Sequence, residues 1–240
     1  MFPKKIQKLT KKQQKIRDAF MEFWLKELPK KYVYMEKFNH EYPLRSYSER
    51  ARKTLEIGAG VGSHIPFEDL GNQTYYALEL RKDLAKIIKS RIVNAGRVKI
   101  VVGDCQKYLP FKNNFFDRII AIHVLEHLPN LSRALNEVVR VLKKDGLFSV
   151  VIPCEGGLVY SFAREISAKR LFKKKFPGES YDWLIKSEHV NMPGEIIAEL
   201  QNFFVIENMA YFPLGVPCIN LNLAIGLTLR LKAENKQLYI

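Results

Sequence analysis

The sequence contains few cysteines and no long apolar segment. Its 240 residues include three cysteines, and no two of them have the paired spacing of a zinc site: Cys105, Cys154 and Cys218. An odd number also argues against a disulfide framework. No segment reaches the roughly 18 uncharged apolar residues of a membrane-spanning helix, and the lysine-rich start lacks the apolar run of a signal peptide. We therefore expect free thiols, no metal site and a cytoplasmic location.

Acidic residues are scarce relative to basic ones. The chain has 39 Lys and Arg against 25 Asp and Glu, a net charge of +14. Residues 1–31 hold ten of the basic residues and three acidic ones, and a second basic group follows at Lys169, Arg170, Lys173, Lys174 and Lys175. Such an excess concerns partners and solubility rather than the fold.

The basic N-terminal segment also has an apolar stripe with the spacing of an amphipathic helix. Its members are Ile16, Phe20, Phe23, Trp24 and Leu28. One interpretation is that the stripe packs on the domain while the lysines face water. The alternatives are peripheral contact with an anionic membrane or contact with nucleic acid. We treat residues 1–50 as an N-terminal helical extension.

From residue 51 onward, short apolar runs alternate with helical patterns. The runs predict strands near 54–57, 74–79, 98–102, 116–122 and 147–152. Helical periods fall near 84–92 and 131–142. This alternation predicts right-handed crossovers and a doubly wound α/β domain with a mostly parallel sheet. Beyond it we expect a basic segment at 158–176, a helix at 195–203 and two further strands at 204–211 and 219–231, the last alternating strictly between apolar and polar residues.

A glycine-rich turn follows the first of these strands, in the stretch LEIGAGVG at 55–62. Glycines at 58, 60 and 62 permit a tight turn and let the backbone approach a ligand. The dinucleotide pattern G-x-G-x-x-G would require a small residue such as glycine where Ser63 stands, whereas G-x-G-x-G is complete. The turn therefore indicates a nucleotide-type ligand, with a purely structural turn as the alternative.

Acidic residues stand at the ends of the next two strands. Glu79 lies 21 residues after Gly58, where a carboxylate can accept hydrogen bonds from both hydroxyls of a ribose. Asp104 closes the third strand, where it can accept from an adenine amine. The alternative for either residue is an exposed acid at a strand end. Together with the glycines they predict one ligand site at the carboxyl edge of the sheet.

These stretches resemble the class I S-adenosylmethionine-dependent methyltransferases, in particular the type 11 group. The similarity covers LEIGAGVG (55–62), YYALEL (75–80), VVGD (101–104), FFDRIIAIHVLEHLPN (115–130) and VLKKDGLFSVVIP (141–153). It implies a Rossmann-like, seven-stranded, mostly parallel sheet whose last strand is antiparallel. It also implies a methyltransferase domain over 51–240, with a helical insertion or lid at about 155–190 after the fifth strand.

The resemblance also implies roles for individual residues. Gly58, Gly60 and Gly62 would pass beside the methionine part of S-adenosylmethionine, Glu79 would hold the ribose, and Asp104 the adenine. The full set of implied cofactor-binding residues is Glu56, Gly58, Ala59, Gly60, Gly62, Glu79, Leu80, Asp104, Cys105 and His123. Pro66 and the acids Glu68 and Asp69 depart from the family pattern, so the helix after the first strand is expected to be short or displaced.

Methyl transfer from a sulfonium needs alignment of a nucleophile and exclusion of water, and requires no metal or covalent intermediate. A hydroxyl acceptor also benefits from a base, for which histidine is suited. The three catalytic candidates are His123, His127 and His189. Each has an alternative: His123 as a residue lining the pocket, His127 as a structural residue, and His189 without a catalytic role. His40 and His64 are expected to be surface or local-turn residues.

The expected activity is transfer of a methyl group from S-adenosylmethionine to a small-molecule, sugar or lipid-linked acceptor, at an oxygen atom, with S-adenosylhomocysteine as product. Basic and aromatic residues of the insertion suit an anionic or glycan acceptor, although a solvated helix end would look the same. The alternatives are an RNA methyltransferase, disfavoured because no RNA-binding module is present, and a non-catalytic methyltransferase-like binding protein. An oxidoreductase is disfavoured by Ser63.

Overall fold

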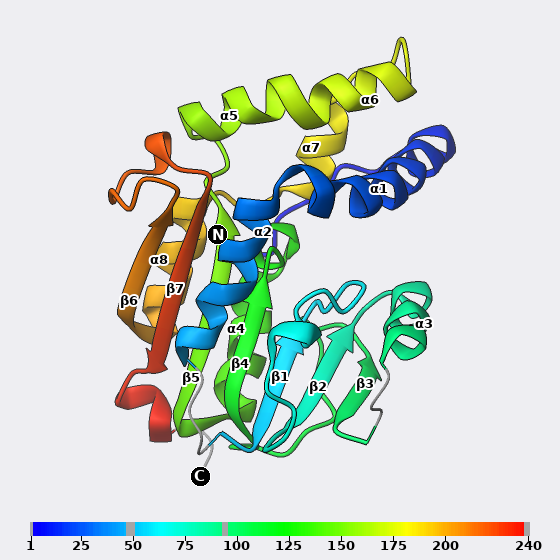
Figure 1. The fold of residues 1–240 in the computed structure, drawn as a ribbon. Coiled ribbons are helices and arrows are strands. Elements are labelled where there is room, and N and C mark those ends of the chain that lie inside the picture. Colours follow the sequence, from blue (N-terminus) through cyan, green and yellow to red (C-terminus); the bar gives the residue numbers. More distant parts are fainter. Residues whose placement is uncertain (1, 47–50, 93–95, 238–240) are drawn as a thin grey trace.

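The chain forms a seven-stranded sheet flanked by helices (Figure 1). The computed structural model describes residues 2–46, 51–92 and 96–237, and the side chains of 24–31 and 236–237 lie outside the description. The strand order is β3-β2-β1-β4-β5-β7-β6. The strands are β1 (Lys53–Ile57), β2 (Thr74–Glu79), β3 (Val98–Val102), β4 (Phe116–Ile122), β5 (Leu142–Pro153), β6 (Phe204–Phe212) and β7 (Ala224–Leu231). β7 pairs antiparallel with both neighbours, and the remaining pairs are parallel, which confirms the predicted fold.

The register brings the ends of the first strands to one edge. Ile57 at the end of β1 pairs with Leu78, and Glu79 at the end of β2 pairs with Val102 at the end of β3. β4 runs parallel to β1, with Ala121 opposite Ile57. The loops after β1, β2, β3 and β4 therefore leave the sheet side by side, which is where open α/β sheets bind ligands.

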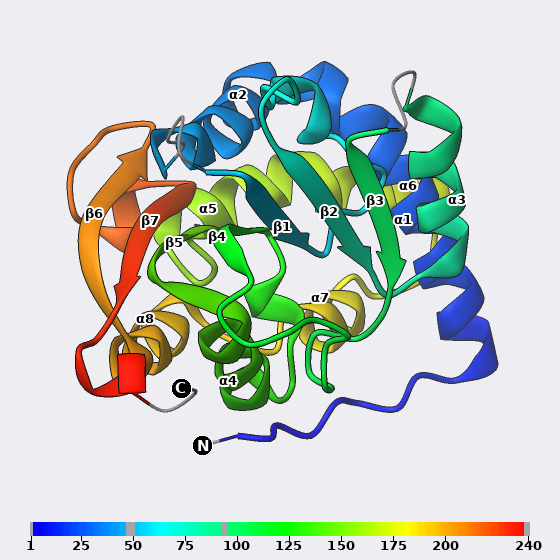
Figure 2. The same ribbon diagram turned by 90° about the horizontal axis from the view of Figure 1, so that it is seen from below.

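Helices cover both faces of the sheet (Figure 2). α4 (Leu131–Val141) and α8 (Pro193–Phe203) lie on one face and α2 (Val33–Glu41) on the other, while α3 (Lys82–Arg91) lies near the β3 edge. The predicted stripe of α4 is buried: Leu131, Ala134, Leu135, Val138 and Val139. Burial of each leucine or valine contributes about 1.5–3 kcal/mol, so this helix anchors the larger core cluster formed with β4 and β5.

A short turn replaces the usual helix after β1, as the departures in the sequence predicted. It contains a single 3-10 turn, Ile65–Phe67. His40 and His64 were expected to be surface or local-turn residues. His64 does lie in a turn, just before Ile65, but neither residue is at the surface: both are buried, His40 within α2, and their rings stack with centroids 5.6 Å apart. Glu68 turns inward with His64 because Arg118 of β4 is fully buried and ion-pairs with Glu68, and a buried guanidinium requires a partner.

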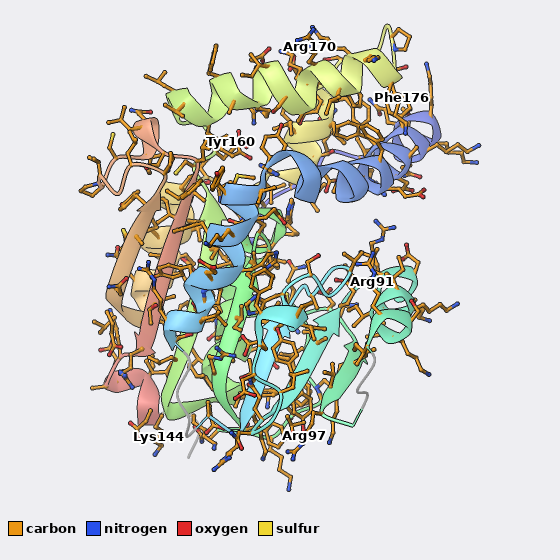
Figure 3. All side chains as sticks on the ribbon, in the orientation of Figure 1. Arg91, Arg97, Lys144, Tyr160, Arg170 and Phe176 are labelled. Atoms are coloured by element: carbon orange, nitrogen blue, oxygen red, sulfur yellow. The ribbon has the colours of Figure 1, made fainter. Side chains whose placement is uncertain are left out.

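The N-terminal helix α1 (Lys11–Lys31) packs its apolar stripe against a layer formed by the insertion. This layer consists of α5 (Leu158–Arg164), a π-helical turn (Glu165–Lys169), α6 (Arg170–Lys175) and α7 (Asp182–Glu188), and it lies beyond the carboxyl ends of the parallel strands (Figure 1). Phe20 of α1 is buried, with its ring 5.1 Å from that of Phe172. Ile16, Phe23 and Phe176, the last at the end of α6 (Figure 3), pack on the same cluster. The side chains of Trp24 and Leu28 lie outside the described ones.

The rest of the extension is packed on the sheet. Tyr42 is buried, and its hydroxyl lies 3.2 Å from the Thr228 hydroxyl. A Cβ on Gly226 of β7 would lie 2.5 Å from the Tyr42 ring, so only glycine allows this close approach. β7 begins at Ala224 and not at 219 as predicted, because residues Ile219–Leu221 form a 3-10 turn capped by Asn222 side-chain bonds. Within the described residues, no helix is long and apolar enough to cross a membrane.

Candidate functional site

A cavity of about 620 Å³ lies at the carboxyl ends of β1 to β4, beneath α1. Its size is in the range of small-molecule sites. Several residues predicted from the sequence lie in its wall: Gly58, Glu79, Leu80, Asp104, Cys105, His123 and His127. Of the other predicted residues, Glu56, Ala59, Gly60, Gly62 and His189 are not in this lining.

The glycine turn adopts a backbone conformation that other residues rarely adopt. Gly58, Gly60 and Gly62 have φ values of +69°, +56° and +78°. The amides of Gly58 and Ala59 both donate to the Leu78 carbonyl, at 2.8 and 3.0 Å, and so tie the turn to β2. A Cβ on Gly58 would lie 2.4 Å from Val124 Cγ2, whereas one on Gly60 would meet no described atom within 4 Å.

Glu79 and Asp104 stand beside this turn. Glu79 is almost buried, and its two oxygens accept hydrogen bonds from the amides of Gly60 and Arg81, each at 2.8 Å. Asp104 Oδ1 accepts a hydrogen bond from the Gln106 amide at 2.9 Å. Its other oxygen has no hydrogen-bond partner among the described residues. Both carboxylates thus keep acceptor capacity next to the cavity.

Glu56 lies behind the turn, in the core of the sheet. Its carboxyl accepts a hydrogen bond of 2.9 Å from the Tyr75 hydroxyl. Burial raises the pKa of Glu56 to about 8, because the Tyr75 hydrogen bond compensates only part of the lost hydration. At neutral pH Glu56 is therefore mostly uncharged, and its role is separate from that of the carboxylates in the cavity wall.

Helix α1 closes the cavity from above. Arg17, Asp18 and Met21 line it together with Glu188 at the end of α7. Arg17 Nε lies 3.9 Å from Glu188 Oε1 and pairs more closely with Asp18. No motif in the sequence indicates these lining residues, because their place depends on how α1 packs against α6 and α7.

Beyond β4, His123 pairs with a buried carboxylate. His123 has a φ of +51°, uncommon for a residue with a side chain. Its Nδ1 lies 3.3 Å from Glu126 Oε1. Its Nε2 and the second oxygen of Glu126 are buried without a hydrogen-bond partner among the described residues. Glu126 stands in the short 3-10 turn Leu125–His127.

Glu126 is charged despite its burial. Burial alone would raise its pKa, but the hydrogen bond from His123 and the charges of His127, His123 and His189 outweigh burial, and they lower the pKa to about 2. The three candidate catalytic histidines therefore share one buried anion. The sequence placed Glu126 beside His127 but gave no indication that His189 would join them.

His127 and His189 face each other across this anion, with ring centroids 5.1 Å apart. His127 Nδ1 lies 2.7 Å from the Glu188 carbonyl, and His189 Nδ1 lies 2.7 Å from Glu155 Oε2. Arg164 also pairs with Glu155. Burial raises the pKa of Glu155, but the hydrogen bond from His189 and the charges of His189 and Arg164 lower it below its ordinary value. Nothing in the sequence singled out Glu155 or Arg164.

Residues 55–150 match a family model described as a methyltransferase domain. The matched segment spans β1 to most of β5 and includes the glycine turn, Glu79, Asp104 and the His123–Glu126 pair. This part of the chain therefore belongs to the class I methyltransferases that use S-adenosylmethionine. The resemblance found in the sequence is confirmed.

Two curated relatives illustrate the range of the similarity. The sterol 4-C-methyltransferase strm-1 of Caenorhabditis elegans is 37% identical over 100 residues, which cover 40% of this chain and 29% of the relative. A demethylmenaquinone methyltransferase of Staphylococcus aureus strain MRSA252 is 29% identical over 160 residues, covering 63% of this chain and 60% of the relative. The chain thus spans less than two thirds of either protein.

Among solved structures, a SAM-dependent methyltransferase from Aquifex aeolicus has a TM-score of 0.57 at 14% identity, covering 81% of this chain and 92% of that one. The PH0226 protein from Pyrococcus horikoshii OT3 has a TM-score of 0.58 at 21% identity, covering 83% and 91%. At these identities the likeness shows a shared fold.

The cofactor of this family fits the residues present. The open space beside Gly60 and the free oxygen of Asp104 provide room and an acceptor where an adenosyl group would bind. Glu79 contributes an anionic hydrogen-bond acceptor at the end of β2. Asp104 is the other acidic residue that the described sheet edge contributes to the cavity wall. The cavity therefore has the donor and acceptor set that a ribose and an adenine require.

Proposed function

We propose that this protein transfers the methyl group of S-adenosylmethionine to a small-molecule acceptor, at an oxygen atom. The observation that carries the proposal is one cavity whose wall contains Gly58 of the glycine turn, Glu79, Asp104 and His123, the histidine that pairs with Glu126. S-adenosylmethionine, when bound, supplies a methyl group that is already activated. The chain then has to orient the acceptor, exclude water and receive a proton.

We assign the binding of S-adenosylmethionine to residues at the ends of β1, β2 and β3. Glu79 accepts hydrogen bonds from the ribose hydroxyls, and Asp104 with the Cys105 backbone binds the adenine. Gly58, Ala59, Gly60 and Gly62 form the turn beside the methionine part, with Glu56 buried behind it and Leu80 in the wall. Charge-assisted hydrogen bonds of this kind contribute about 1.5–3 kcal/mol each.

His123 is the general base in this proposal. Because its Nδ1 is held by Glu126, the hydrogen of the neutral ring lies on Nδ1, and Nε2 keeps the lone pair that takes a proton. Glu126 fixes the ring and stabilises the imidazolium that forms. His127 and His189 act on the acceptor side without receiving this proton.

The acceptor class rests on the insertion. Helices α1 and α7 close the cavity, and α5 with the π-helical turn that follows it exposes a row of apolar side chains one turn apart, Leu158, Phe162 and Ile166. Such a row favours an acceptor with an apolar part, including a lipid-linked one. The names of the two curated relatives refer to a sterol and a menaquinone precursor, which agrees with an apolar small molecule as acceptor. The sterol enzyme is named for methylation at carbon, so the methylated atom is to be established on the product.

The test has two stages. Calorimetric titration with S-adenosylhomocysteine, S-adenosylmethionine and NAD should show binding of the first two alone. Release of S-adenosylhomocysteine is then followed over a panel of quinols, sterols, lipid-linked sugars and transfer RNA, with the product identified by NMR.

Replacement of His123 by Gln should lower kcat by about 10²–10⁴-fold and leave the affinity for S-adenosylhomocysteine within about threefold. His40→Gln is the matched control, because His40 also pairs with a glutamate but lies outside the cavity. Turnover of transfer RNA alone would support the RNA alternative. Cofactor binding without turnover of any acceptor would support a non-catalytic binding protein, and binding of NAD alone would overturn the proposal.

A further inference from the structure

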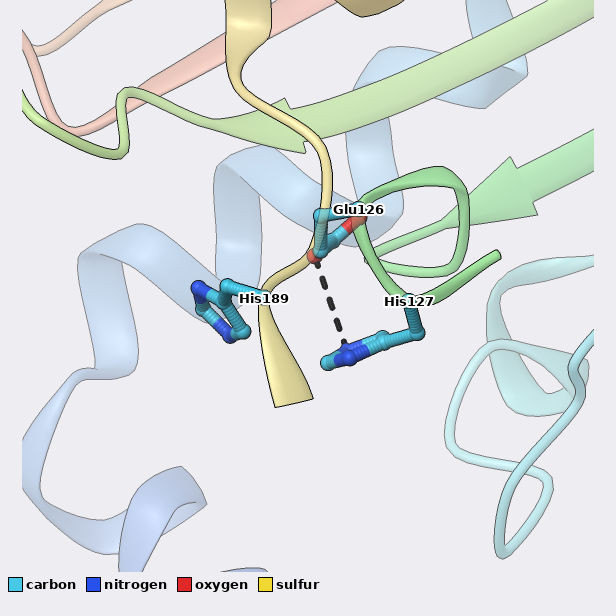
Figure 4. Close-up of side chains that lie close together, drawn as sticks. All are labelled: Glu126, His127 and His189. Atoms are coloured by element: carbon cyan, nitrogen blue, oxygen red, sulfur yellow. Dashed lines mark ion pairs between the residues drawn. The ribbon is translucent and has the colours of Figure 1, made fainter. Parts of the chain in front are cut away.

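Three metal-ligating side chains meet next to the cavity (Figure 4). They are Glu126 and His127, from the turn after β4, and His189, from the end of α7. One ligand atom from each lies within 4.8 Å of the other two, and no other group of this kind occurs among the residues described. The sequence analysis expected no metal site, and no local spacing indicated this group, because its members come from two segments more than 60 positions apart.

The hydrogen bonds of the two histidines fix which nitrogen is available. The Glu188 carbonyl can only accept a hydrogen bond, so His127 carries its hydrogen on Nδ1 and keeps a lone pair on Nε2. His189 likewise directs Nδ1 at the Glu155 carboxylate. Imidazoles that bind metals have this arrangement, in which the second nitrogen donates to a carbonyl or a carboxylate.

Glu126 completes the set. Its Oε1 lies 3.3 Å from His123 Nδ1 and 3.9 Å from His127 Nε2, while Oε2 is buried without a hydrogen-bond partner among the described residues. A buried, unpartnered carboxylate oxygen costs free energy that a bound cation would recover. Oε1 therefore faces both His123 and the proposed cation position, and rotation of the carboxylate would bring the unpartnered Oε2 to the cation.

We propose that Glu126, His127 and His189 bind one divalent transition-metal ion. Two imidazoles and one carboxylate suit Zn²⁺ or Fe²⁺ and not Mg²⁺ or Ca²⁺, which prefer oxygen ligands alone. Ligand distances of about 2.0–2.2 Å require the three side chains to close by roughly an ångström from their present separation. Three protein ligands leave a position open, as in catalytic metal sites.

The open position lets the ion bind the acceptor and take part in methyl transfer. This role of the ion rests on the proposed function. His127 and His123 both line the cavity, so the ion would lie between it and the insertion. An acceptor hydroxyl bound to the ion would become more acidic. As its oxygen attacks the methyl carbon, the carbon–sulfur bond would break to release S-adenosylhomocysteine, and the hydroxyl proton would pass to His123 Nε2. The ion would thereby position the acceptor that the sequence pattern leaves undefined.

The test uses the full chain without a histidine tag, stripped of metal by a chelator. Titration with Co²⁺ should produce visible d–d absorption that saturates at one equivalent and is displaced by Zn²⁺, with the stoichiometry checked by elemental analysis. Thiolate ligands would add charge-transfer bands, which are not expected here. The same metal should raise the melting temperature.

Variants of the proposed ligand residues test whether the bound metal occupies this site. Glu126→Gln, His127→Gln and His189→Gln should abolish stoichiometric binding, and Glu155→Gln should weaken it by about 10–100-fold through loss of the His189 hydrogen bond. His40→Gln, the control histidine, should bind as the wild type does. Equal Co²⁺ binding in all variants, or no d–d absorption in the wild type, would overturn the proposal.

S-adenosylhomocysteine affinity, measured on the same samples, separates this inference from the proposed function. A ligand variant that loses Co²⁺ but still binds S-adenosylhomocysteine is folded, so its lost absorption reports on the metal site. Wild-type protein that binds Co²⁺ but not S-adenosylhomocysteine would keep the metal site and remove the methyltransferase assignment. Turnover unchanged by the metal would remove the ion's task while leaving its binding.

Discussion

Two buried glutamates stand at the ends of neighbouring strands, and their surroundings are opposite. Glu56 of β1 has a tyrosine hydroxyl as its partner, and burial raises its pKa to about 8. Glu126, beyond β4, is equally buried, but three histidines outweigh the effect of burial and lower its pKa to about 2. At neutral pH the side of the cavity near Glu56 thus has a mostly uncharged carboxyl group buried in the fold, and the side near Glu126 has a buried, charged carboxylate.

This difference separates the cofactor side from the acceptor side. In the proposed function, the cofactor is bound by backbone turns and by Glu79 and Asp104 at strand ends. The acceptor is bound by side chains of α1, the insertion and the turn after β4, which contains Glu126. The first is a property of one continuous segment, and the second exists only after distant segments have packed together.

The largest expected effect concerns the two glutamates themselves. Because the folded-state pKa of Glu56 lies above the unfolded value of 4.5, its contribution to stability is complete below pH 4.5 and is lost as the pH rises through 8. The loss is on the order of 5 kcal/mol. Glu56→Gln should therefore flatten the fall in unfolding free energy between pH 5 and 9, as measured by urea denaturation.

Glu126→Gln should act in the opposite direction. Its folded-state pKa is lowered, so the carboxylate contributes stability above pH 4.5 that is lost as the pH falls through about 2. The variant should be less stable than the wild type at pH 7 and approach it in acid. If the unfolding free energy changed with pH in the same way in the wild type and in both variants, the opposite pKa shifts of Glu56 and Glu126 would be contradicted.

The glycine turn offers a matched pair. Gly58→Ala combines a left-handed φ with a Cβ 2.4 Å from Val124, and should destabilise by about 2–4 kcal/mol. Gly60→Ala has the same type of φ but open space, so about 1–2 kcal/mol is expected. Thermal denaturation measures both, and equal losses would show that the contact with Val124 is not what makes Gly58 necessary.

Glu79→Ala tests the cofactor side directly. Loss of its charge-assisted hydrogen bonds should weaken S-adenosylhomocysteine binding by about 1.5–3 kcal/mol, roughly 10–150-fold. Asp83→Ala is the control, since Asp83 is an exposed acid four residues away that pairs with Arg81. Calorimetry gives both affinities, and an equal change in the two variants would point to general electrostatics rather than a specific contact.

The smallest effect is expected at His189. Burial lowers its pKa, but the hydrogen bond to Glu155 and the charges of Glu126 and Glu155 outweigh burial and raise it above 6.5. The stabilisation is complete below pH 6.5 and is lost as the pH rises through the folded-state pKa. His189→Gln should therefore cost more stability at pH 5.5 than at pH 9. A pH-independent cost would show that the ring contributes by packing alone.

The sequence determined the parallel part of the fold and most of the cofactor side, because both are local. Strand periodicity, the glycine spacing and acids at strand ends are fixed within short segments, and the carboxyl ends of parallel strands must share one edge. The exceptions are informative: His64 is buried because its partner Glu68 pairs with Arg118, which is fully enclosed on β4, and His40 is buried with its ring stacked on His64 and Phe67.

Tertiary structure alone decided the acceptor side. The approach of His189 to Glu126, the hydrogen bond that His189 donates to Glu155, and the closure of the cavity by Arg17 and Met21 each join segments far apart in the chain. The hydrophobic periodicity of the sequence does not predict these contacts, because they depend on how α1 and the insertion pack over the sheet. The physical reason is that backbone turns are set by neighbours in sequence, whereas a shared buried charge is set by neighbours in space.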